Sequence, residues 1–137
     1  MKAISLAAIA ALALCVGGCD DGLGAPASLT GGAWVIEEIG GTAMAKPLPT
    51  IEFRADGKFG GVASCNSYGG TYRDEGGRVV LRPTFATKMA CAAPRMAQEK
   101  LLLDALGSGG AYSVGTDRLV IEGQQRIEAR RVLGPQG

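Results

Sequence analysis

The stretch VASCNSYGGTY at residues 62–72 holds the side chain with the most obvious chemistry, the thiol of Cys65. A second thiol, Cys91, follows in TKMAC at residues 87–91. A cysteine in such a setting can serve as a nucleophile, a metal ligand, half of a disulfide or part of a structural corner. The residue types in the rest of the chain separate these interpretations.

The chain contains no histidine. This removes the Cys–His dyad, the Ser–His–Asp triad and every metal site that uses imidazole. The carboxylates of Glu37, Glu38, Glu52 and Glu99 show no pairing that would suit acid–base catalysis. We therefore expect no catalytic residue, no metal and no cofactor, and we do not expect an enzyme.

The first 18 residues have the layout of a secretory signal, with one basic residue, an apolar run and small residues before Cys19. The apolar run is short for a helix that spans a membrane. The stretch CVGGC resembles the lipobox of bacterial lipoproteins, where a peptidase cuts before the cysteine and fatty acyl chains such as palmitate are attached. On that resemblance residues 1–18 are a signal peptide, and residues 19–28 are the acylated N-terminus and a flexible tether. An ordinary secretory signal with an incidental cysteine is the alternative.

A lipid anchor on Cys19 predicts a domain held in the periplasm of a bacterial cell envelope. Asp20 follows the acylated cysteine, and in enteric lipoproteins an aspartate at that position favours retention in the inner membrane. This sorting rule differs between bacterial groups, so the choice between the inner and the outer membrane stays open. The formal net charge of +1 provides no attraction to nucleic acid. The expected partners are the membrane, through the anchor, and an envelope protein; the oligomeric state is left open.

From Trp34 onward, short runs of β-forming residues alternate with glycine or aspartate turns. Asp56-Gly57 is a strong hairpin signal because both residues tolerate positive φ, and the pair Gly60-Gly61 favours a bulge or a bend. Strands are expected at residues 34–39, 50–55, 58–64, 70–74, 78–83, 84–90, 111–114, 117–122 and 125–132.

One segment, residues 94–107, carries helix signals instead. It begins with proline, ends at glycine and places Met96, Leu102, Leu103 and Leu106 on one face. Together the elements predict a mainly β (α+β) fold. The expected architecture is a compact antiparallel β-barrel-like domain of about eight strands with one packed α-helix.

Cys65 and Cys91 are the only thiols in the part of the chain that should fold as a domain. A secreted domain lies in an oxidising compartment, so we expect them to form a disulfide. Two free buried thiols and a redox pair are the alternatives, although a catalytic redox pair usually has the spacing CxxC. Asn66, beside the first cysteine, is expected to shape a turn through its own backbone.

The motifs SCNSYGGTY (64–72) and TKMAC (87–91), followed by M-x-x-E-x-x-L-L-x-A-L (96–106), resemble the signature of the META domain of bacterial heat-shock lipoproteins. The resemblance covers nearly the whole mature chain, and we assign residues 29–134 to this domain. The family usually has glycine where this chain has Ser64. The resemblance implies a structural role for the signature residues, which are Trp34, Cys65, Asn66, Gly70, Tyr72, Thr87, Met89 and Cys91.

The family resemblance implies a compact antiparallel β-barrel-like fold with a helix and no catalytic activity. It favours a non-enzymatic cell-envelope lipoprotein that acts in heat, antibiotic or other envelope stress. Two other classes remain. A small barrel can carry an apolar ligand, and an exposed edge or the KPLP loop (46–49) can present itself to a protease as a peptide-binding inhibitor.

Overall fold

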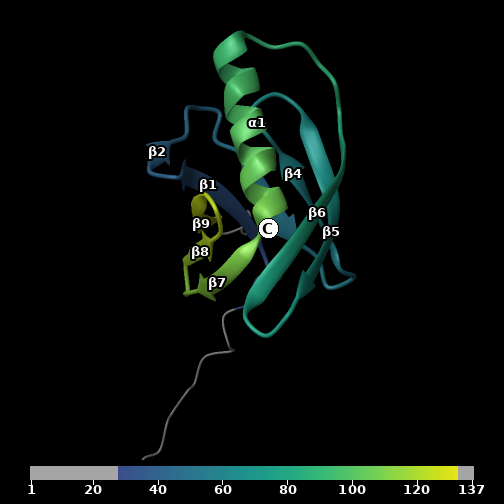
Figure 1. Cartoon of the computed structure of the whole chain (residues 1–137), viewed down its shortest axis with the longest axis vertical. Coiled ribbons are helices and arrows are strands. Elements are labelled where there is room, and N and C mark those ends of the chain that lie inside the picture. The colour runs from purple at the N-terminus through teal and green to yellow at the C-terminus, as the bar shows by residue number, and fades with distance from the viewer. Residues whose placement is uncertain (1–27, 133–137) are drawn as a thin grey trace, which may run out of the picture.

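The computed structural model describes residues 28–132. It contains one helix and nine strands, all paired in antiparallel fashion, and Figure 1 shows the helix lying beside the curved sheet. The elements are, in chain order, β1 (Ala33–Ile39), β2 (Thr42–Ala43), β3 (Thr50–Phe53), β4 (Lys58–Val62), β5 (Ser67–Asp74), β6 (Arg78–Ala86), α1 (Ala93–Ser108), β7 (Gly110–Val114), β8 (Arg118–Glu122) and β9 (Arg126–Val132).

Eight of the strands form a ring. The order is β1-β3-β4-β5-β6-β7-β8-β9, and β9 pairs with β1 to close the ring. The short β2 pairs with Glu38 and Ile39 at the end of β1. Helix α1 packs against β6 and β1. The predicted mainly β, barrel-like fold with one packed helix is therefore confirmed.

Aromatic and branched side chains fill the interior of the ring. Trp34, Phe53, Phe59 and Tyr68 are among the largest fully buried side chains. The indole N–H of Trp34 donates to the carbonyl of Leu29 at 3.1 Å, so its one polar atom is satisfied inside the core. Trp34, one of the predicted signature residues, is therefore part of the core.

The Asp56-Gly57 hairpin forms between β3 and β4 as predicted. Gly57 has a φ of 81°, and the N–H of Lys58 donates to Asp56 Oδ1 at 3.1 Å. Of the bulge or bend predicted at Gly60-Gly61, the bulge does not form, since β4 pairs with β3 and with β5 without a register shift. The shift lies instead between Gly69 and Gly70, opposite β6.

One strand boundary and the burial of two helix residues also differ from the sequence-based prediction. The expected strands at 78–83 and 84–90 form one strand, β6, which ends at Ala86 and is followed by an irregular connection to α1. In the helix, Leu102 and Leu106 are buried as expected, but Met96 is exposed and Glu99 is buried. Helical spacing places Glu99 on the same face as Leu102 and Leu106, and its hydrogen bonds to the β4–β5 loop offset the burial of its carboxyl group.

The predicted signal peptide, the proposed lipidation at Cys19 and most of the tether lie outside the described residues. Within residues 28–132, the single helix is not long and apolar enough to cross a membrane.

Candidate functional site

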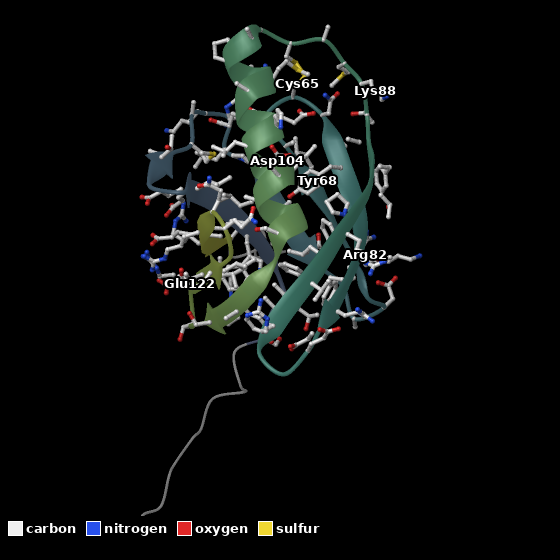
Figure 2. The ribbon with its side chains drawn as sticks, in the orientation of Figure 1. Cys65, Tyr68, Arg82, Lys88, Asp104 and Glu122 are labelled. Carbon is white, nitrogen blue, oxygen red and sulfur yellow. A yellow bond between two sulfur atoms is a disulfide. The ribbon has the colours of Figure 1, made fainter. Side chains whose placement is uncertain are left out.

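Cys65 and Cys91 are joined by a disulfide, as predicted, with their Cα atoms 6.2 Å apart. This separation lies within the usual range for a disulfide. The bond connects the loop between β4 and β5 to Cys91 in the β6–α1 connection, just before the N-cap residue of α1, Ala92. Figure 2 shows the sulfur atoms beside the upper end of the helix, near Lys88. The nucleophile and metal-ligand interpretations of Cys65 do not fit this state.

Asn66 is 1% exposed and uses its amide as a bridge. Its Oδ1 accepts from the N–H of Met89 at 2.6 Å and from the hydroxyl of Thr87 at 3.1 Å. Its Nδ2 donates to Glu99 Oε1 at 2.9 Å and to the carbonyl of Met89 at 3.4 Å. The expected local turn cap is therefore wrong, because the amide bonds residues that are distant in the sequence.

Glu99 completes this cluster from α1. Its Oε2 accepts from the backbone N–H groups of Cys65 at 3.2 Å and Asn66 at 2.9 Å, and its side chain is 6% exposed. A carboxylate that accepts several N–H bonds can lie in a protein interior because its desolvation is offset. We call Asn66, Glu99 and the Cys65–Cys91 disulfide the hub.

Two neighbouring bonds tie the helix to the same corner, and a third ties it to the connection between β2 and β3. Gln98 Nε2 donates to Ser64 Oγ and to the carbonyl of Ala45, each at 3.0 Å. The guanidinium of Arg95 donates to the carbonyl of Ser64 at 2.7 Å. Ser64 thus contributes a hydroxyl acceptor that a glycine at this position would lack.

The predicted signature residues fall into two groups. Cys65, Asn66, Thr87, Met89 and Cys91 meet at the hub, through side chains or, for Met89, through the backbone. The remaining three belong to the ring: Trp34 in the core, Gly70 in β5 and Tyr72 in β5.

Gly70 and Tyr72 have separate structural reasons for their identity. A Cβ on Gly70 would lie 1.9 Å from the carbonyl oxygen of Arg82, so only glycine fits. The hydroxyl of Tyr72 donates to the carbonyl of Arg54 at 2.7 Å. Burial, followed by the charges of Asp56 and Asp74, raises the pKa of Tyr72 above its ordinary value.

The residue that sequence reasoning missed is Glu99. The sequence shows Glu99 as one of several carboxylates and as part of the M-x-x-E motif, without indicating a partner for it. The only signal was the motif itself. An acidic residue on the apolar side of an amphipathic helix indicates a buried partner, and here the partners are backbone N–H groups.

The polar atoms of the hub are occupied by one another and by the backbone. Both oxygens of Glu99 and both polar atoms of Asn66 accept or donate hydrogen bonds within the protein. Residues 28–132 hold no group of three or more His, Cys, Asp or Glu side chains with the geometry of a metal site. The arrangement holds the connection after β6 and the start of α1 in one position.

An open groove lies next to the hub, between this connection and α1. It has a volume of about 500 Å³. We call it the β6–α1 groove, and its lining residues are Asn66, Ala86, Thr87, Lys88, Met89, Ala90, Met96 and Glu99.

The comparisons with known proteins agree with this fold and with the signature. The sequence profile described as the META domain matches residues 27–133. A protein from Burkholderia xenovorans, solved by NMR, is similar at 20% identity and a TM-score of 0.63, over 97% of this chain and 99% of that chain. A crystal structure of a DUF4847 family protein from Bacteroides vulgatus is similar at 16% identity and a TM-score of 0.57, over 74% and 93%.

At these identities the likeness to solved structures shows the fold alone. A search of the curated proteins finds no match to the chain.

Proposed function

Because the chain belongs to the META domain family, we propose that it is a non-enzymatic lipoprotein of the bacterial cell envelope that supports tolerance of heat or antibiotic stress through protein contacts. In this proposal acylation of Cys19 anchors the chain to the inner or the outer membrane, and the domain lies in the periplasm. The anchor follows from the CVGGC motif, and the domain from the family.

The observation that carries the proposal is the way the hub is used. The polar and sulfur groups of Glu99, Asn66 and the two cysteines are engaged in bonds that hold the β6–α1 connection in place. The connection and the start of α1 in turn present apolar side chains at the surface, with Met89 58% exposed and Met96 37% exposed. Rigid presentation of apolar side chains supports a role in binding rather than in a reaction.

Gene deletion in the host bacterium, followed by complementation, tests the role. The deletion strain should survive less well after heat, detergent or envelope-directed antibiotics, and the intact gene should restore survival. A Cys19→Ala gene should restore it only in part, since its product cannot be acylated. Labelling with a palmitate analogue checks the anchor and should mark the intact chain but not Cys19→Ala. A deletion strain that equals its parent under all three stresses would contradict the proposal.

A further inference from the structure

The edge of β6 that faces α1 is open beyond the start of the strand. Strand β7 pairs with β6 only at Arg78 and Val79, and the rest of that edge has no strand partner among the described residues. In Figure 1, α1 and β6 diverge from the lower end of the helix toward the connection that joins them. Unpaired backbone groups on an exposed edge are a ready site for another strand.

The hydrogen-bond pattern shows which backbone groups face the β6–α1 groove. The N–H of Thr87 donates to the carbonyl of Ser67 in the neighbouring segment at 2.9 Å, so Thr87 points toward β5. Hydrogen-bonding groups alternate between the two sides of an extended chain. The N–H and C=O of Ala86 and Lys88 therefore point away from β5, and both residues line the groove.

The groove combines this edge with an apolar rim. Met89 and Met96 line it from opposite sides, one from the connection and one from α1, and both are exposed. Methionine is flexible and polarisable, so a pair of methionines can adapt to aromatic or unbranched apolar side chains. A second hollow between the same two elements, lined by Pro83 and Leu103 among others, lies further along the helix.

The groove lining contains one cationic and one acidic residue, Lys88 and Glu99, of which Lys88 is exposed and Glu99 is buried. Lys88 lines the groove and takes part in no ion pair within the part of the chain that the structure describes. Glu99, the acidic residue in the lining, is committed to the hub by its hydrogen bonds. The first turn of α1 carries Arg95 and no acidic residue. A ligand with a carboxylate beside Lys88 would complement its charge.

We propose that the β6–α1 groove binds an extended peptide segment of a partner protein, in which an apolar residue stands close to an acidic one. The segment pairs with the backbone of Ala86 and Lys88 as an added strand, and its apolar side chain lies between Met89 and Met96. Its carboxylate faces Lys88. The inference rests on the proposed function, because it names the class of partner for that protein-contact role.

A peptide array tests this with the purified full chain. Octapeptides vary independently at one apolar position (Phe, Met, Leu or Ser) and at one neighbouring position (Asp, Ser or Lys). Peptides with Phe or Met and Asp should bind best, and replacing Asp by Lys should weaken binding roughly tenfold. Hydrogen exchange of the Ala86 and Lys88 amides should slow when the best peptide is bound, because those amides enter a strand pair.

Surface variants provide the matched controls. Met96→Ser and Lys88→Glu should each weaken the best peptide at least roughly fivefold, as both side chains line the groove. Val62→Ser should leave binding unchanged, because Val62 is an exposed apolar residue of β4 that does not line the groove. Thermal unfolding of the variants verifies that all three are folded.

Three results would overturn the inference: no preference for an apolar residue or for Asp, unchanged exchange at Ala86 and Lys88, or binding to vesicles of anionic phospholipid in place of peptides. The assay contains no cells, so its failure is separate from that of the stress role. If no peptide binds but the deletion strain is sensitive to stress, only the proposal of peptide binding in the groove is rejected. If peptides bind but the deletion strain equals its parent, only the stress role is rejected.

Discussion

The β1–β9 join and the β6–β7 join complete the same ring of strands, but different kinds of bond hold them. At the first join the strands pair along their length, from Ala33 opposite Val132 to Ile39 opposite Ile127. At the second join, pairing is limited to Arg78 with Ala111 and Val79 with Gly110. The ring is thus sealed by backbone on one side and nearly open on the other.

Side chains and a covalent bond take over where the backbone pairing stops. Helix α1 lies against β6, Glu99 and Asn66 fasten it to the β4–β5 corner, and the disulfide joins that corner to the start of the helix. This arrangement keeps the edge of β6 accessible while the domain stays folded. We call the β1–β9 pairing the sealed join, and we call the β6–β7 join, with the disulfide, Asn66 and Glu99 that support it, the open seam.

The largest effect is expected at the sealed join. Trp34→Ala should lower the free energy of unfolding by about 3–5 kcal/mol, because it empties a fully buried site next to β9. The change also removes the indole of Trp34, and the guanidinium of Arg131 lies over this indole at 4.2 Å from its centroid. Urea denaturation measures the loss. Val62→Ala, at an exposed position, should change stability by less than about 0.5 kcal/mol; a similar loss in both variants would refute the assignment.

At the open seam, removal of the disulfide should have the next largest effect. A Cys65→Ser, Cys91→Ser double variant should lose about 3 kcal/mol, since the bond closes a loop with a sequence separation of 26. The same urea measurement applies, and alkylation of the denatured but unreduced wild type should modify neither cysteine. Alkylation of Cys65 and Cys91 there, or a double variant as stable as the wild type, would show that the seam does not depend on the covalent bond.

Asn66→Ala tests the noncovalent part of the same seam. It should lose about 2 kcal/mol, because the N–H of Met89 and an oxygen of Glu99 lose their amide partner in a buried place. Asn66→Asp is the matched control for shape. It keeps an acceptor for Met89 but places a second carboxylate against Glu99, so it should be at least as destabilising. Full stability of Asn66→Asp in urea would mean that donation to Glu99 contributes little.

The sealed join and the open seam also differ in how far they follow from sequence. Strand alternation and the Asp56-Gly57 turn predict hairpins, because these depend on residues that are near one another in the chain. The closure of β1 on β9 joins residues about a hundred positions apart, and no local pattern encodes it. The disulfide can be predicted because the folded domain contains two cysteines, which allow a single pairing, and because an oxidising compartment favours that pairing.

The hub shows the same limit for a single residue. Asn66 was noticed through the motif and assigned to a local turn, whereas its partners lie 21 to 33 positions away. Glu99 was visible in the sequence, but its role depends on two N–H groups of a loop that helix α1 happens to meet. The β6–α1 groove depends on where a strand loses its partner, which only the assembled sheet reveals.

The smallest effect is expected at the narrow β6–β7 join, where the hydroxyl of Tyr112 on β7 donates to Asp74 at the end of β5. That hydrogen bond, with burial and the charge of Asp74, raises the pKa of Tyr112 to about 12. A phenol whose pKa is higher in the folded state adds stability that is fully present below its unfolded pKa of about 10 and is lost as the pH rises toward 12.

Tyr112→Phe should therefore cost about 0.5–1 kcal/mol at pH 8, the value of one exposed hydrogen bond, and its deficit should shrink as the pH rises from 10 to 12. Urea denaturation at pH 8 and pH 11 measures the deficit. Asp74→Asn is the matched variant, since it keeps an acceptor but removes the charge, and it should lower the pKa of Tyr112 in an ultraviolet titration. A deficit that stays constant from pH 8 to pH 11 would mean that ionisation of Tyr112 is not linked to folding.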